Sequence, residues 1–395
     1  MYFALTDEQR ALAETVRDYL ADRFDLTAVR AVFEDAAGDG HPAELWKAFG
    51  EQGWLAALVP EDNDGLGLGL VDAQVLARAF GAGAVPGPWL PTVLAGEAVR
   101  LAGSAAQRAA VLGPLAAGEL VATVALRAPG GAFDASGVGV TAGADARLTG
   151  TASPVEYPAA ARVVVVAATE PDGGVGLYLV EPTGPGVTVT AHESYDGTTR
   201  LGALTLAGAA AERLPGSSAA VLADLNRRGA VLAAADLVGI ARSTLTRTVE
   251  YDKTRVQFGR AVGSFQAIKH ALADLHVAVL MAEHAALYAA HAVDLALPDA
   301  ELAVAVAKAK AGDAAERATG AMIQYHGGIG YTWEHEAHFF YKRAKRLLGS
   351  FGDVGQHLDR IAAPGAVLAT AAVRQAQRAQ RVQTSRGGTR LSAPP

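Results

Sequence analysis

The chain of 395 residues contains no cysteine, and this absence removes several kinds of chemistry at once. Disulfides, thiolate nucleophiles and thiolate metal sites all need that side chain. The chain also lacks an excess of positive charge, because 34 Lys and Arg stand against 41 Asp and Glu, for a formal net charge of -7. A nucleic-acid-binding protein needs a concentrated basic surface to hold phosphates. We therefore expect no nucleic-acid partner.

No uninterrupted apolar run is long enough to predict a membrane span. The longest stretch without a charge, residues 79–96, contains three prolines, which break a helix because each removes a hydrogen bond and clashes with the preceding turn. The amino-terminal region carries Asp7 and Glu8 and so has no apolar signal-peptide core. We expect a soluble, cytoplasmic protein with no membrane partner.

The first part of the chain has the apolar spacing of helices. Thr6 and Gln9 stand three residues apart before an apolar stripe, which is the pattern of a capping box at a helix start. Aromatic residues indicate a second helix, and further helical stretches cover 71–80 and 103–117, with a proline-rich segment between them. We assign residues 1–118 to an N-terminal α-helical domain.

The middle part changes to the two-residue period of β-strands. Its strand-like runs, bounded by Gly, Pro and Asp, are LVATVAL, GVGVTA, RVVVVAAT, GLYLVEP and VTVTA. Tight spacing without intervening helices indicates an antiparallel or mixed sheet, barrel-like in shape. We assign residues 119–214 to a middle antiparallel β-barrel-like domain.

The helical period then returns and holds almost to the end. Residues 217–254 predict one helix of 38 residues, which would be about 57 Å long. The next helix carries apolar residues at alternating three- and four-residue steps, and a third runs from about Ala300 to a stop at Gly327. Two more helices complete a C-terminal four-helix-bundle domain, 215–384, followed by a disordered tail, 385–395. The fold class is α+β multidomain.

Two stretches at turns between these helices carry groups suited to a dinucleotide. In RVQFGRAVGSFQ, Arg255 is a donor of fixed charge, and the side chains of Gln257 and Gln266 are neutral donors. Phe258 and Phe265 provide flat apolar faces. Taken singly, the arginine could form a surface ion pair and the phenylalanines could belong to the core.

The second stretch, QYHGGIGYT, begins at Gln324. The side chain of Gln324 can bond a ribose or a phosphate, while Gly327 and Gly328 allow the backbone to approach a ligand closely.

In order and spacing, these two stretches resemble the signature of acyl-CoA dehydrogenases, and the whole chain resembles that family. There, the two stretches reach across a subunit interface and hold the adenosine and pyrophosphate of an FAD bound mainly by the neighbouring chain. The resemblance implies FAD-dependent α,β-dehydrogenation of an acyl-CoA thioester by an oligomer, with electron-transfer flavoprotein or a similar acceptor. It also implies the cofactor-binding residues, which are Arg255, Gln257, Phe258, Phe265, Gln266, Gln324, Gly327 and Gly328.

The catalytic base of that family is missing from both of its expected places. Most members carry a glutamate in a YEGT-like stretch, where this chain has Phe351, and a minority carry it 26 residues before the motif arginine, where this chain has Gly229. The nearest carboxylate is Asp353, which stands three residues before Gln356 in the spacing of a helix cap. A cap and a displaced base are both open interpretations, so the catalytic residues are unknown.

The sheet also departs from the family pattern. Members usually carry a Thr-Glu pair and a Trp-Ile-Thr run beside the isoalloxazine ring, where this chain has Leu126-Arg127 and Pro154-Val155-Glu156. Three hypotheses follow. The chain is a supporting subunit of a hetero-oligomer with a related acyl-CoA dehydrogenase chain, a self-sufficient flavoenzyme with a displaced base, or a non-enzymatic scaffold.

The ten histidines do not form a metal-site pattern. His335 and His338 are three residues apart, whereas the zinc-protease helix needs its histidines four apart on one face. The remaining histidines have no regular ligand spacing. We expect no metal.

Overall fold

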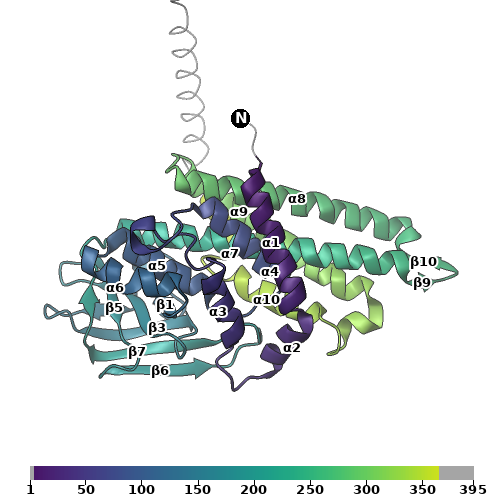
Figure 1. Cartoon of the computed structure of the whole chain (residues 1–395). Coiled ribbons are helices and arrows are strands. Elements are labelled where there is room, and N and C mark those ends of the chain that lie inside the picture. The colour runs from purple at the N-terminus through teal and green to yellow at the C-terminus, as the bar shows by residue number, and fades with distance from the viewer. Residues whose placement is uncertain (1–3, 364–395) are drawn as a thin grey trace, which may run out of the picture.

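The computed structural model describes residues 4–363, in which helices come before and after a sheet in the sequence and the sheet lies at one end of the long helices (Figure 1). This order confirms the expected fold class. Thr6 and Gln9 form the predicted capping box, with the Gln9 backbone N–H donating to the Thr6 hydroxyl. The N-terminal helices are α1 (Asp7–Arg23), α2 (Leu26–Glu34), α3 (Ala43–Glu51), α4 (Leu70–Ala82), α5 (Trp89–Ala102) and α6 (Ala105–Ala116).

Helix α5 corrects the sequence analysis, which expected only a proline-rich connection there. Pro88 directly precedes the helix and Pro91 lies in its first turn. Backbone N–H groups of a first helical turn have no partner within the helix, so proline costs little at these positions. The prolines therefore mark the beginning of a helix instead of interrupting one.

The sheet has eight strands in the order β6-β7-β3-β2-β4-β5-β8, with β1 paired to β4. Most neighbours are antiparallel, but β1 and β2 both run parallel to β4, so the sheet is mixed, which is one of the two arrangements expected from the strand spacing. The terminal strands β6 and β8 do not pair, which leaves the curled sheet open. The strands are β1 (Ala122–Ala125), β2 (Val140–Ala142), β3 (Leu148–Glu156), β4 (Val163–Thr169), β5 (Val175–Val180), β6 (Val187–His192), β7 (Leu201–Ala209) and β8 (Glu212–Arg213).

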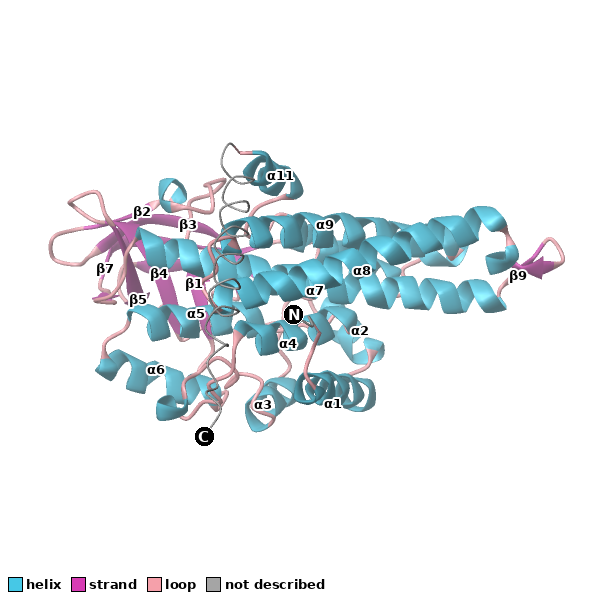
Figure 2. Cartoon of the chain, turned by 90° about the horizontal axis from the view of Figure 1, so that it is seen from above, coloured by secondary structure: helices cyan, strands magenta, loops and turns pink. Residues whose placement is uncertain are grey.

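The C-terminal helices include one of 36 residues, close to the length expected from the sequence. Figure 2 shows the long helices of the bundle side by side, with a short β-hairpin projecting from one end of the bundle. The elements are α7 (Ala219–Thr254), the hairpin strands β9 (Val256–Gln257) and β10 (Arg260–Ala261), α8 (Gln266–Asp294), α9 (Ala300–Tyr325), α10 (Ala337–Leu348) and α11 (Val354–Ala362).

The N-terminal helices and the bundle share one hydrophobic core. Helices α4 and α7 approach closely at two glycines, because a Cβ on Gly81 would collide with the Asp236 carbonyl and one on Gly239 with the Arg78 carbonyl. Whether residues 1–118, 119–214 and 215–384 are separate domains stays a prediction. The expected tail at 385–395 lies outside the described residues.

Two helices of the described chain, α7 and α8, are long and apolar enough to cross a membrane by length and composition alone. This is weak evidence, because the most apolar part of α7 is 83% buried, as in a core helix. The corresponding part of α8 is only 28% buried and exposes Val277 and Met281. A cytoplasmic location and the absence of a membrane partner stay predictions.

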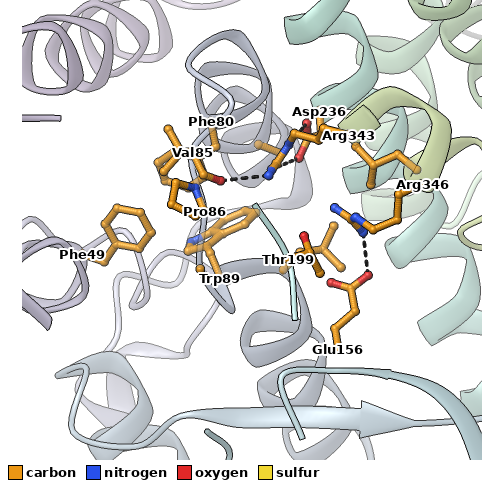
Figure 3. A pocket seen from close by; sticks show the side chains of 14 residues that line it. Phe49, Phe80, Val85, Pro86, Trp89, Glu156, Thr199, Asp236, Arg343 and Arg346 are labelled. Atoms are coloured by element: carbon orange, nitrogen blue, oxygen red, sulfur yellow. Dashed lines mark hydrogen bonds and ion pairs between the residues drawn. The ribbon is translucent and has the colours of Figure 1, made fainter. Parts of the chain in front are cut away.

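A buried network of charges joins all three parts of the chain (Figure 3). Arg343 of α10 bonds both carboxylate oxygens of Asp236 on α7, at 3.1 and 2.5 Å, and donates to the Val85 carbonyl at 2.9 Å. Arg346, one turn on, bonds Asp196 of the β6–β7 loop at 2.7 Å and Glu156 of β3 at 2.8 Å. A cavity of about 20 Å³ beside these groups has room for one water molecule.

Replacing Arg343 with Met should destabilise the chain by about 3–5 kcal/mol, because the Asp236 carboxylate would remain buried without its partner. The measurement is the free energy of unfolding from denaturant titration. The matched control is Arg147→Met, which breaks the exposed pair with Asp145 and should cost less than about 1 kcal/mol. Equal losses in the two variants would contradict the structural role of the buried pair.

Candidate functional site

The two nucleotide-binding stretches expected from the sequence lie at the same end of the helical bundle. Tyr251, in the last turn of α7, stacks on His326, directly after α9, with ring centroids 4.3 Å apart. The Tyr251 hydroxyl donates to the His326 carbonyl at 3.4 Å. Arg255 and Gln324 flank this stacked pair in sequence, so the two motifs share one end of the molecule.

His326 is a fixed part of this junction. Burial lowers the pKa of its imidazole, which is therefore neutral near pH 7. One ring nitrogen, Nδ1, lies 2.7 Å from the Met322 carbonyl, which selects the tautomer with the proton on Nδ1. The stacked Tyr251 and His326 rings thus connect the two motifs at the end of the bundle.

The polar side chains assigned to the cofactor are exposed and unpaired. Within residues 4–363, the side chains of Arg255, Gln257, Gln266 and Gln324 form no hydrogen bond or ion pair. The alternative of a surface ion pair for Arg255 is therefore not what the structure shows. All four are available to a ligand or to a partner chain.

The aromatic residues of the hairpin are also accessible. Phe258, at the hairpin turn, is 92% exposed and has a left-handed backbone with φ of 52°. The Phe265 ring is nearly perpendicular to the Phe258 ring, with centroids 6.2 Å apart, and the Arg260 guanidinium carbon lies 4.0 Å from the Phe265 ring centroid. Neither ring belongs to the buried core, so the core alternative fails for both.

The glycines of the second stretch leave open space. Gly327 has φ of 66°, which favours glycine, and a Cβ on Gly327 or Gly328 would meet no heavy atom within 4 Å. A ligand could therefore approach the backbone here. Other large apolar residues of these two turns are exposed as well, namely Val256, Ile329, Tyr331 and Trp333.

The two places where the family resemblance puts a glutamate meet in space. A Cβ on Gly229 of α7 would collide with the Phe351 ring, which lies over the glycine. The same ring packs against Phe133, with centroids 5.7 Å apart. Positions 229 and 351 are therefore neighbours in space, and the Phe351 ring fills the room beside the glycine.

Asp353 is a helix cap. Its Oδ1 accepts from the Gln356 backbone N–H at 2.8 Å, and the Gln356 side chain accepts from the Asp353 N–H at 3.0 Å. The two groups form a capping box at the start of α11, as one of the two interpretations predicted. Asp353 does not line the cavity beside Phe351.

Lys308 holds the loop that carries Phe351, and the sequence analysis missed it. Its ammonium donates to the carbonyls of Leu347, Leu348 and Gly352 at 3.0, 3.1 and 3.0 Å. Burial lowers the pKa of Lys308 to about 7. The available signal was a lysine within the alanine-rich, buried stretch of α9. The loop geometry is thus imposed by a side chain from another helix.

A cavity of about 220 Å³ lies beside Phe351. The residues that depart from the family pattern in the sheet line it together with Phe351, namely Leu126, Arg127, Pro154 and Glu156. Glu156 is the one carboxylate among the residues lining this cavity, and it is bound to Arg346. The structure thus gathers the sheet departures and Phe351 around one cavity.

Asp252, at the end of α7, is another buried group that the sequence analysis missed. It is 1% exposed, and neither carboxylate oxygen has a hydrogen-bond partner among the described residues. Burial raises the pKa of Asp252 to about 6. Its backbone packs against Gly263, in the turn between the hairpin and α8. A group close to the hairpin therefore carries a cost of burial.

Replacing Asp252 with Asn should stabilise the chain near neutral pH. The folded chain keeps the proton up to a pKa of about 6 and the unfolded chain only to 3.8, so stability falls as pH rises between these values and stays lower above them. At about 1.36 kcal/mol per pKa unit, the variant should gain about 1–3 kcal/mol at pH 7.

Denaturant titration at several pH values measures this effect. The matched control is Asp274→Asn on the exposed face of α8, which should change stability by less than about 0.5 kcal/mol. The explanation fails if Asp252→Asn and the unmodified chain have the same pH dependence between about pH 4 and pH 7.

The chain matches known families at both ends. Residues 6–119 match the acyl-CoA dehydrogenase N-terminal domain, and residues 219–385 match the C-terminal domain. Acyl-CoA dehydrogenase IpdE2 of Mycobacterium tuberculosis is 34% identical over 339 residues, which are 86% of this chain and 91% of the relative. Acyl-CoA dehydrogenase FadE27 of the same organism is 32% identical over 330 residues, 80% of this chain and 87% of the relative.

Solved structures show the same relationship. A chain of the ChsE4-ChsE5 complex from Mycobacterium tuberculosis superposes with a TM-score of 0.84 at 29% identity, over 92% of this chain and 98% of that one. A chain of the Tcur3481-Tcur3483 steroid ACAD variant gives 0.82 at 29% identity, over 93% and 99%. The chain therefore belongs to the acyl-CoA dehydrogenase family.

Proposed function

We propose that this chain is a supporting subunit of an FAD-dependent acyl-CoA dehydrogenase that is assembled from two unlike chains. In this assembly it holds the nucleotide end of an FAD bound mainly by a related partner chain, which supplies the catalytic base and the pocket for the flavin ring. The observation that supports the proposal is the position of the Phe351 ring, which lies over Gly229, so that the two positions where the family resemblance places a glutamate pack against each other.

The nucleotide end of FAD fits the end of the bundle. Arg255 would neutralise the pyrophosphate, and the amides of Gln257, Gln266 and Gln324 would bond phosphate or ribose oxygens. Phe258 and Phe265 would pack on flat parts of the nucleotide, and the backbone at Gly327 and Gly328 would lie against it. These donors are exposed and have no partner within the described part of the chain, as expected if their partner comes from another chain.

The flavin ring does not fit the chain's own cavity in the way that the family resemblance implies. The Glu156 carboxylate and the Arg127 guanidinium line the wall where members place their ring-side contacts. The base position is filled by Phe351. A positioned general base is worth about 10² to 10⁴ in rate, so a chain without one needs a partner for the reaction.

Exposed apolar surface also supports assembly. Helix α8 exposes Val277, Leu280 and Met281, and the hairpin exposes Phe258. Large exposed apolar residues at one surface mark interaction sites. Two of the similar solved structures are named as pairs of unlike chains, ChsE4-ChsE5 and Tcur3481-Tcur3483, which agrees with a hetero-oligomer.

When bound, the flavin would accept the β hydride of the acyl-CoA substrate, and an electron-transfer flavoprotein or a similar protein would reoxidise it. A chain in a solved structure named for the electron transferring flavoprotein of Acidaminococcus fermentans is 25% identical, with a TM-score of 0.82. The acceptor for this chain is an inference from the family resemblance. The position of Asp353 as a helix cap gives no support to a displaced base.

Flavin stoichiometry tests the proposal. The purified chain should hold little flavin alone, and it should hold flavin when co-expressed with a related acyl-CoA dehydrogenase chain that has the glutamate. Flavin absorbance, compared with protein absorbance after size-exclusion chromatography, measures the ratio. A yellow homo-oligomer that dehydrogenates acyl-CoA without any partner would refute the proposal.

Replacing Arg255 with Gln in the complex should weaken FAD retention by about 10- to 100-fold, because a charge-assisted hydrogen bond to phosphate would be lost. The dissociation constant for FAD, measured after removal of the flavin and titration back, gives this value. The matched control is Arg317→Gln on α9, whose side chain is exposed and paired with Asp313. Unchanged FAD affinity of the Arg255 variant would remove the assigned role.

A further inference from the structure

The cavity beside Phe351 contains polar groups that the proposed function does not use. It lies within this chain, between the ends of strands β1 and β3, helix α7 and the Phe351 loop, and has a volume of about 220 Å³. Its lining is largely apolar, with Leu90, Val124 and Leu201 among the contributing residues. The polar groups therefore stand out against an apolar wall.

Arg127 is the first unused group. One guanidinium nitrogen donates to the Gly131 carbonyl at 3.0 Å, and the guanidinium lies 4.3 Å from the centroid of the Phe133 ring. No carboxylate of the described chain pairs with it. Burial without a nearby acid lowers the pKa of Arg127, although an arginine stays protonated at neutral pH. A half-buried positive charge with free N–H donors therefore faces the cavity.

Asn226 is the second unused group. It is 9% exposed, it lines the same cavity, and its Oδ1 is buried without a hydrogen-bond partner among the described residues. A buried polar oxygen without a donor costs about 1–3 kcal/mol, so such groups commonly meet a donor on a ligand or water. A hydroxyl group would provide that donor.

Glu156 and Arg346 determine the orientation of a charged ligand in this cavity. The two side chains bond each other at 2.8 Å, and Arg346 also bonds the buried Asp196, so this side of the cavity has no spare positive charge. A carboxylate would be repelled by Glu156 and attracted by Arg127. The anionic end of a ligand would therefore lie at Arg127.

We propose that this cavity binds an apolar carboxylate, with its anionic end on Arg127 and a hydroxyl or similar donor on the Asn226 oxygen. A cavity of about 150 Å³ accommodates benzene, so this one accommodates an apolar body of about eight carbons. The site is independent of the nucleotide-binding end of the bundle. The carboxylate can belong to a free acid or to the far end of a dicarboxylic acyl-CoA thioester.

Calorimetric titration of the purified full chain tests this site with named probes. Octanoate should bind at one site per chain, and uncharged methyl octanoate should bind at least about tenfold more weakly. The CoA monothioester of octanedioic acid distinguishes the two sources. If octanoate binds, the site accepts free acids; if only the thioester binds, and binding depends on Arg127, the carboxylate belongs to an acyl-CoA. Absence of binding by both probes would overturn the proposal.

Variants locate the contacts. Arg127→Gln should weaken binding of the carboxylate probe by about 10- to 100-fold, whereas Arg127→Lys, which keeps the charge, should retain most of it. The matched control is Arg162→Gln, an exposed arginine outside the cavity, which should bind like the unmodified chain. Equal binding by the Arg127→Gln variant, checked as folded by circular dichroism, would refute the assignment.

A second comparison tests Asn226. The unmodified chain should bind 8-hydroxyoctanoate more tightly than octanoate, because the hydroxyl supplies the donor that the buried oxygen lacks. Asn226→Leu should reverse this order, since an apolar wall favours the probe without the hydroxyl. The same order of affinity in both chains would exclude the contact with Asn226.

Discussion

The buried ionic network centred on α10 is the interaction on which the rest of the structure depends. Arg343 ties α7 to the N-terminal helices, and Arg346, one turn on, ties α10 to the sheet. Buried charges tolerate little displacement, because a partner left alone is strongly destabilising. The network therefore fixes how the sheet stands against the bundle. It also holds Glu156 in the wall of the cavity beside Phe351. The contact between Arg346 and Glu156 therefore both joins α10 to the sheet and places a carboxylate in that cavity.

That space is shaped from the other side by Phe351. The ring can lie over Gly229 because the glycine leaves room on α7 and because Lys308 holds the loop backbone with three hydrogen bonds. The phenylalanine at position 351 and the glycine at position 229 therefore depend on each other in packing. A glutamate restored at either position would have to displace the packing of the other. The packing of Phe351 on Gly229 is therefore one local arrangement that involves both positions and the Lys308 contacts.

Local patterns in the sequence predicted much of the fold, including the Thr6 cap, the long helix α7 and the bundle, whereas strands β3 and β7 could not be found. Gly150, Pro154 and Gly202 break the two-residue apolar period in them, and cross-strand pairing holds these strands where local propensity is weak. For the site, motif spacing indicated the exposed donors, but Lys308 acts from a distant helix. Contacts of that kind depend on tertiary packing, which no single stretch of sequence records.

The end of the bundle that carries Arg255 and the cavity beside Phe351 differ in how they could bind FAD, and this difference bears on assembly. Among residues 4–363, Arg255 and three amides at one end of the bundle have no partner, while the cavity beside the sheet is lined by Glu156 and Phe351. In a homo-oligomer, every copy would present residues for the nucleotide end of a neighbour's FAD. The neighbour, however, would have the same cavity and so would not provide the expected pocket for the isoalloxazine ring. Unpaired donors of this kind are useful only beside a chain that differs in its cavity. We therefore infer that the asymmetry within one chain reflects an asymmetry between subunits.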